Sequence, residues 1–139
     1  MLTFVGEFLY KGVKQVTEFP SISNAEWAVM RVIWDKSPIK SADIIKELKP
    51  STNWKPKTVQ TLIRRLADKG VIGYTVDGKT YTYYPKLPEE ECVAQETDNF
   101  LDKIYNGSLR HLMINFVENN KLSAEEITEL ITILEKHKD

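Results

Sequence analysis

The chain of 139 residues is 42% hydrophobic and 28% charged, with a formal net charge of -1, which suits one ordinary domain or two small ones. A single Cys and two His exclude a disulfide framework and a multi-cysteine zinc site, and they favour a reducing cytosol. No apolar run is long enough to span a bilayer, and Glu7, Lys11 and Lys14 interrupt the stretch where a secretory signal would lie. We therefore expect a cytoplasmic protein without membrane insertion.

The near-zero net charge conceals a strong difference between the two halves of the chain. Residues 21–88 contain twelve Lys and Arg against six Asp and Glu, whereas residues 89–139 contain five against twelve. This asymmetry predicts a basic half that meets a polyanion and an acidic half with another task. Since the whole molecule is not basic, any attraction to nucleic acid must come from one local surface.

The basic half opens with two predicted helices. Ser23 and Glu26 have the spacing of a capping box, in which each side chain satisfies a free backbone N–H, so we expect a helix over residues 23–36. After a short extended piece at Ile39, Ser41 is predicted to cap a second helix that continues to Leu48. Residues 49–53 have the composition of a turn.

A third helix is predicted between Pro56 and Gly70, because Pro suits the first helical position and Gly suits the position after the end. Its apolar residues recur at helical spacing and form one face: Val59, Leu62, Ile63 and Leu66. The opposite face carries mostly cations and hydrogen-bonding side chains: Lys57, Gln60, Thr61, Arg64, Arg65 and Asp68. Arg, Gln and Thr can read base edges in a major groove and Lys binds phosphate, so this segment has the chemistry of a recognition helix.

After Gly70 the pattern changes to alternation, and Asp77-Gly78 is a strong hairpin signal between two segments of high β-propensity. The order helix, short strand, helix, helix, hairpin is that of a winged helix-turn-helix, a mostly α fold with a small β-wing (α+β). The alternative is a small α+β domain whose basic surface is merely solvated. On the winged-helix interpretation double-stranded DNA is the partner, and the following residues are predicted to contact it: Ser41, Lys55, Lys57, Thr58, Gln60, Thr61, Arg64, Arg65, Lys79 and Tyr81.

The acidic half is predicted to form three helices. Three glutamates at residues 89–91 suit the positive end of a helix dipole, Ser108 can cap a second helix, and Ser123 with Glu126 is another capping box. Three helices with wide apolar stripes in about fifty residues bury poorly on their own, so we expect two copies to interleave as a homodimer. The predicted dimerisation residues are Phe100, Leu101, Ile104, Leu109, Leu112, Met113, Phe116, Ile127, Leu130, Ile131 and Leu134.

Two further functions compete with DNA binding by a regulator. An enzyme could use Cys92 with His111, but the neighbouring glutamates disfavour the thiolate that a nucleophile needs. A winged-helix repressor could instead be gated by a small molecule, although the sequence has no Gly-rich loop or convergent polar cluster. Neither His111 nor His137 lies in a metal-ligand pattern, so no metal, cofactor or catalytic residue is expected.

Five segments in register resemble the penicillinase repressor family, the relatives of the methicillin-resistance repressor: "ISNAEWAVMRVIW", "WKPKTVQTLIRRLADKG", "YYP", "NFLDKIYNGSL" and "NFVENNKLSAEEITELITILEKHK". The similarity runs from about Ile22 to Lys138. It implies a homodimer, with an N-terminal winged helix and a three-helix dimerisation region, on dyad operators upstream of β-lactamase and sensor genes. It also implies release by proteolysis: a membrane β-lactam sensor with a zinc protease domain triggers cutting in the first dimerisation helix, at the matching bond Asn99–Phe100.

The resemblance places a winged helix at residues 21–88, a dimerisation region at 89–139 and an extension at 1–20 outside the family pattern. That extension is either an extra helix or an upstream leader. Lys55 stands where the family pattern has Ser, which removes a side-chain cap worth about 1 kcal/mol. The chain also ends without the Cys-x-Cys pair of the copper-responsive relatives, which argues against copper sensing.

Overall fold

The computed structural model describes residues 19–138, so nearly all of the predicted extension at residues 1–20 lies outside the described part of the chain. Contacts divide the chain into two compact units, one that ends at Ala94 and one that begins at Gln95. The first unit therefore continues past residue 88 into the first turns of the following helix. No helix among the described residues is long and apolar enough to cross a membrane.

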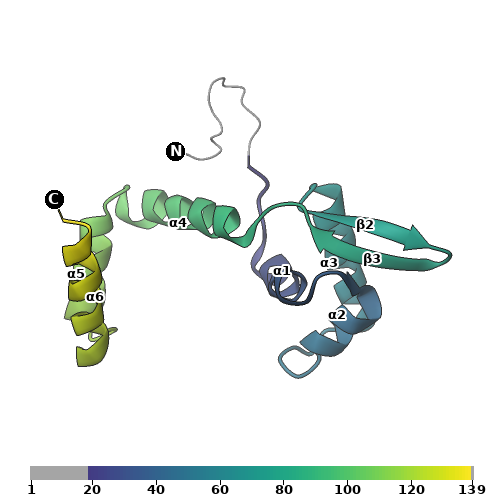
Figure 1. Cartoon of the computed structure of the whole chain (residues 1–139), viewed down its shortest axis with the longest axis horizontal. Helices are drawn as coiled ribbons and strands as arrows, with labels where there is room; N and C mark the ends of the chain where they lie inside the picture. Colours follow the sequence, from purple (N-terminus) through teal and green to yellow (C-terminus); the bar gives the residue numbers. More distant parts are fainter. Residues whose placement is uncertain (1–18, 139) are drawn as a thin grey trace, which may run out of the picture. The chain divides into compact units, whose positions relative to one another are not determined.

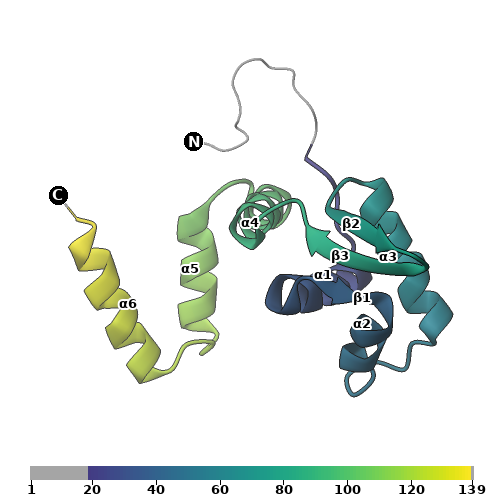
Figure 2. The same ribbon diagram turned by 45° about the vertical axis from the view of Figure 1, so that its right-hand side comes forward.

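The first unit has the predicted order of helices and strands (Figure 1). Its elements are α1 (Asn24–Lys36), β1 (Ile39–Lys40), α2 (Ser41–Leu48), α3 (Pro56–Asp68), β2 (Ile72–Asp77) and β3 (Thr80–Pro85). The strands form one antiparallel sheet in the order β1-β3-β2, and Figure 2 shows this sheet with α1, α2 and α3 packed around it. This arrangement confirms the predicted winged helix, with the hairpin as its wing.

The starts of two helices agree with the sequence-based prediction, and the start of a third differs from it. Ser23 and Glu26 form the predicted capping box before α1, and Pro56 occupies the first turn of α3 behind Lys55, which makes no side-chain cap. The predicted Ser41 cap of α2 is wrong, because Lys40 holds the N-cap position and Ser41 is already helical. The chain passes directly from β1 into α2, so no loop residue is left to serve as a cap.

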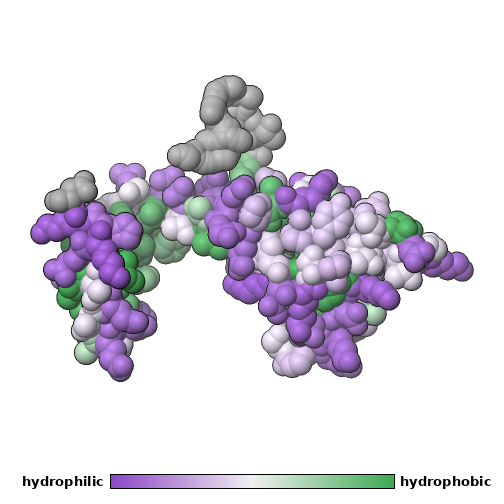
Figure 3. All heavy atoms as spheres, in the orientation of Figure 1, coloured by the Kyte–Doolittle hydropathy of each residue, from purple (hydrophilic) through white to green (hydrophobic). Residues whose placement is uncertain are grey.

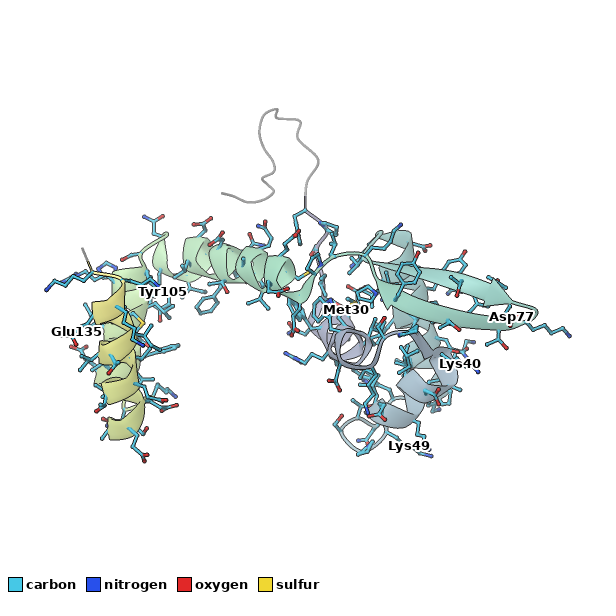
Figure 4. The ribbon with its side chains drawn as sticks, in the orientation of Figure 1. Met30, Lys40, Lys49, Asp77, Tyr105 and Glu135 are labelled. Carbon is cyan, nitrogen blue, oxygen red and sulfur yellow. The ribbon has the colours of Figure 1, made fainter. Side chains whose placement is uncertain are left out.

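The hairpin forms where the Asp77-Gly78 signal predicts it. Tyr74 pairs with Tyr83 and Asp77 pairs with Thr80, so that Asp77 marks the tip of the wing in Figure 4. Gly78 has φ +64°, a left-handed conformation that glycine adopts without a steric penalty.

The core of the first unit is built from the apolar faces of all three helices and the base of the sheet. Met30, labelled in Figure 4, is fully buried on α1. Cys92, in the helix that follows the sheet, is 2% exposed and belongs to the same core. The Trp34 indole N–H donates to the Leu87 carbonyl oxygen at 3.0 Å and ties the segment after the sheet to α1. These contacts explain why the unit extends beyond residue 88.

One carboxylate, that of Glu26, is buried in the first unit with 1% of the residue exposed. It accepts hydrogen bonds from the Ser23 N–H at 2.8 Å and from Lys69 Nζ at 2.6 Å. Burial raises the pKa of the Glu26 carboxyl, but the hydrogen bonds from Lys69 and Ser23 outweigh that effect and hold the pKa below its ordinary value of 4.5. The ionised carboxylate is therefore part of the folded structure.

This lowered pKa predicts a specific acid sensitivity. A carboxylate whose pKa is depressed on folding stabilises the protein above its unfolded pKa, and the contribution is lost as the pH falls through the folded value. Between about pH 5 and pH 3, the free energy of unfolding should fall more steeply for the wild type than for Glu26→Gln, because only the wild type must protonate this group. Urea unfolding at a series of pH values measures the difference, and parallel curves would contradict it.

The second unit contains the rest of α4 (Glu89–Tyr105), α5 (Leu109–Glu118) and α6 (Ala124–Lys136). Ser108 caps α5, and Ser123 with Glu126 forms the predicted capping box of α6. No residue of α5 or α6 is buried. The helices thus begin and end where local sequence signals place them, yet within one chain they enclose no core of their own.

Candidate nucleic-acid interface

The apolar and polar faces of α3 are separated as the sequence predicts. Val59, Leu62, Ile63 and Leu66 are buried against the rest of the unit. The following predicted contact residues are exposed on or beside the helix: Lys55, Lys57, Thr58, Gln60, Arg64 and Arg65. With one acid, Asp68, at its far end, this face combines fixed positive charge with side chains that can recognise bases.

Thr61 is the half-buried member of this face. Its hydroxyl donates to the Lys57 carbonyl oxygen at 3.0 Å, one turn earlier in α3. Because the hydroxyl proton is already engaged, Thr61 can offer a partner its methyl group and the acceptor capacity of its oxygen. A methyl group suits apolar contact with the methyl of thymine.

A hollow of about 430 Å³ lies between the start of α2, the polar face of α3 and the wing. It brings together four of the predicted residues, and its lining is Lys40, Ser41, Ala42, Gln60, Ile63, Lys79, Thr80, Tyr81 and Tyr83. Figure 4 shows Lys40 where the sheet leads into α2. The other predicted residues, at positions 55, 57, 58, 61, 64 and 65, lie along α3 outside this lining.

Sequence reasoning missed Lys40 as a lining residue of the hollow. Lys40 could have been found from its position next to Ser41 at the start of a helix, where a cation and free backbone N–H groups favour an anion.

Three tyrosines form a cluster on one face of the wing. The ring centroids of Tyr74 and Tyr81 are 5.1 Å apart, those of Tyr74 and Tyr83 are 6.1 Å apart, and those of Tyr81 and Tyr83 are 6.4 Å apart. Burial, followed by the neighbouring Tyr81 and Tyr74, raises the pKa of the Tyr83 hydroxyl above its ordinary value. This hydroxyl therefore remains protonated at neutral pH and can donate a hydrogen bond to a phosphate oxygen.

The arrangement around Cys92 does not favour nucleophilic catalysis. Burial, followed by the neighbouring Glu91 and Glu89, raises the pKa of the Cys92 thiol to about 11. A nucleophilic cysteine needs the opposite shift and an accessible sulfur. Among residues 19–138, no group of three or more His, Cys, Asp and Glu side chains could hold a metal ion.

The Asn99–Phe100 bond lies inside α4 and not in a loop. Both residues are exposed, the Phe100 ring lies 6.0 Å from that of Tyr105, and the Asn99 side-chain oxygen accepts a hydrogen bond from the Gln95 amide at 3.0 Å. Because the bond is part of regular helix, a protease that binds extended substrate requires α4 to open locally first.

All eleven predicted dimerisation residues are exposed or half-buried, and none is enclosed within the single chain. The exposed fractions reach 54% at Ile104, 57% at Leu109 and 62% at Leu134. Figure 3 shows hydrophobic residues, in green, among the hydrophilic ones on the visible face of the second unit. Four further large apolar side chains on α4, α5 and α6 are also exposed: Val93, Ile114, Val117 and Ile133.

Comparison with known proteins identifies a family and several proteins to which this chain is similar. The family model described as penicillinase repressor matches residues 22–136. The chain is 43% identical to the penicillinase repressor of Bacillus licheniformis, over 88% of this chain and 95% of that protein. It is also 43% identical to the methicillin resistance regulatory protein MecI of Staphylococcus aureus, over 83% of this chain and 94% of that one. A solution structure of the DNA-binding domain of the repressor BlaI has 39% identity and a TM-score of 0.49, covering 55% of this chain and 93% of that domain.

Proposed function

This chain belongs to the penicillinase repressor family, and from that membership and the cationic face of α3 we propose that it is a DNA-binding transcriptional repressor of β-lactam-resistance genes. It acts as a homodimer on dyad operators and is not an enzyme. Residues 21–88 bind DNA and residues 89–139 dimerise. The function requires no cofactor.

The exposed, cationic face of α3 beside the hollow is the observation that carries this proposal. Gln60, Thr61 and Arg64 read base edges in the major groove, since the buried stripe of α3 turns them outward. The remaining contacts are to phosphate, from the cations and hydroxyl groups that flank the helix on both sides: Ser41, Lys55, Lys57, Thr58, Arg65, Lys79 and Tyr81.

The lining of the hollow bears on the alternative of a small-molecule-gated repressor. A ligand pocket of this size is usually lined mainly by apolar and aromatic side chains with a few polar groups. Here Lys40 and Lys79 contribute two positive charges beside Ser41 and Thr80. This lining suits a phosphate of the DNA backbone better than an apolar ligand.

Dimerisation follows from the exposed apolar surface of α4, α5 and α6. Side chains such as Phe116 and Ile131 are 38% and 51% exposed in the single chain, and a second copy would remove them from water at a gain of about 25 cal/mol per Å². A two-fold dimer presents two copies of α3, which matches an operator with dyad symmetry.

Induction occurs by proteolysis, triggered through a membrane β-lactam sensor. Cutting at Asn99–Phe100 severs the first dimerisation helix and leaves the winged helix intact. Because the bond lies in regular helix, the rate depends on the free energy of local opening of α4.

Salt dependence of DNA binding tests the proposed docking surface. If a dimer neutralises about eight phosphates, the logarithm of affinity should fall with the logarithm of salt concentration at a slope of about -7. Lys55→Gln should reduce the slope by about two, one unit per protomer, whereas Lys121→Gln in the second unit should leave it unchanged. Fluorescence titration at several salt concentrations measures these slopes.

The proposal would not survive a wild-type slope shallower than about -2, because electrostatic contact with the DNA backbone would then be too small to dock α3. Equal slopes for Lys55→Gln and Lys121→Gln would show that Lys55 does not contact the phosphates.

A further inference from the structure

The ammonium group of Lys69 joins the end of α3 to the start of α1. Lys69 follows the last residue of α3, and its Nζ donates to Glu26 Oε1 at 2.6 Å and to the Ser21 carbonyl oxygen at 2.7 Å. The same Oε1 accepts the Ser23 N–H at 2.8 Å, as part of the capping box of α1. One carboxylate oxygen therefore links the first turn of α1 to the C-terminal end of the proposed recognition helix.

Burial distinguishes this ion pair from an ordinary surface pair. The Glu26 side chain is 2% exposed and that of Lys69 is 35% exposed, whereas Lys36 and Glu47, 3.6 Å apart, are 48% and 41% exposed. Exposed pairs contribute little to stability, but a buried carboxylate that loses its cation is strongly destabilising. The Lys69 ammonium is therefore held at a fixed place.

The capping box alone does not require this burial. Ser123 and Glu126 form the same box at the start of α6, with backbone-to-side-chain distances of 2.9 and 3.1 Å, and there the glutamate is exposed. Capping is thus achieved in this chain without a buried carboxylate. The burial of Glu26 and its bond to Lys69 need a reason beyond the local start of a helix.

The two ends of α3 are held differently. At the N-terminal end, Lys55 occupies the cap position without a side-chain hydrogen bond. Along its length the helix rests on buried apolar side chains, whose attraction is not directional. The bonds of Lys69 are directional and short, so they fix where the C-terminal end of α3 lies against the start of α1.

We propose that the Glu26–Lys69 pair sets the orientation of α3 on DNA, with Lys69 acting as a positioning residue that does not contact phosphate. The inference rests on the proposed role of α3 in recognition. Removing the pair lets the C-terminal end of α3 move, which misaligns Arg64 with the bases although no DNA-contacting side chain is removed.

Four proteins test this proposal: the wild type, Lys69→Met, the charge-balanced double variant Glu26→Gln/Lys69→Met, and the control Lys36→Met from the exposed pair. Each is titrated on its preferred DNA site and on random DNA at several salt concentrations, and its unfolding is followed by circular dichroism. Lys69→Met should bind the preferred site about tenfold more weakly, comparable to the loss of one base contact, with a smaller loss on random DNA. The double variant leaves no unpaired charge inside, so it should fold and show the same loss of preference.

The slope of affinity against salt separates positioning from direct contact. A lysine bound to phosphate lowers that slope by about one per protomer when it is removed, whereas the slopes of the Lys69 variants should equal those of the wild type and Lys36→Met. A reduced slope would overturn the proposal, as would variants that bind the preferred site as tightly as the wild type. A double variant that cannot fold would overturn it too, because the pair would then serve the fold alone. If the wild-type protein itself showed no preferred DNA site, the recognition role of α3 would be refuted instead.

Discussion

A fragment that ends at Asn99 should be folded and monomeric, and should bind the full dyad site about a hundredfold or more weakly than the intact chain. The fragment retains the first unit, which ends at Ala94, together with the core contact of Cys92. It lacks α5, α6 and the end of α4, whose exposed apolar side chains we propose as the dimer interface. Losing the link between two half-sites removes an advantage of about 10²–10⁴ in affinity without damaging any DNA contact.

The control for this prediction is a duplex that contains only one half-site. On that DNA the fragment and the intact chain should bind within a few-fold of each other, because each engages it through a single winged helix. Sedimentation equilibrium gives the oligomeric state of both proteins. A fragment that remains dimeric, or that binds the full site nearly as well as the intact chain, would contradict the account of dimerisation and of induction by cutting.

Substitutions on the outward face of α3 should change which DNA is preferred. Gln60→Ala should weaken binding to the preferred site by about 1–3 kcal/mol and have much less effect on random DNA. Thr61→Ser should cause a loss of similar kind, because it removes the methyl group while keeping the hydroxyl that bonds to Lys57. Thr61→Val keeps a methyl in place and should retain more of the preference than Thr61→Ser. Competition titrations with both DNAs measure each loss.

A matched control is available in α6. The Thr128 hydroxyl donates to the Ala124 carbonyl oxygen at 3.1 Å, the same intrahelical bond that Thr61 makes, on an exposed position outside the winged helix. Thr128→Ser should leave both affinities unchanged. Equal losses on preferred and random DNA for the α3 variants would show that Gln60 and Thr61 touch only the DNA backbone.

Much of the fold follows from signals that lie within a few residues of the structure they determine. Pro56 and Gly70 bracket α3, and the capping boxes at Ser23 and Ser123 mark the starts of α1 and α6. The alternating pattern around Asp77-Gly78 predicts the wing. These features were predictable because capping, turn geometry and helical periodicity are local.

The features that sequence reasoning missed depend on residues far apart in the chain. Glu26 and Lys69 are separated by 43 positions, and nothing near either one indicates that the carboxylate is buried. The hydrogen bond from Trp34 to Leu87 and the burial of Cys92 likewise depend on how the helices pack. The Ser41 cap failed because a two-residue strand runs directly into α2, a junction that local propensity does not reveal.

Selection of bound sequences from a pool of random duplexes tests the central proposal most directly, since it assumes no operator. The intact chain should enrich an inverted repeat whose half-sites are centred about 10 base pairs apart, or a multiple of that spacing, because a two-fold dimer presents its two recognition helices on one face of the duplex. A pool that yields no common sequence, or a single site without dyad symmetry, would contradict the proposal that this chain reads DNA as a homodimer through α3.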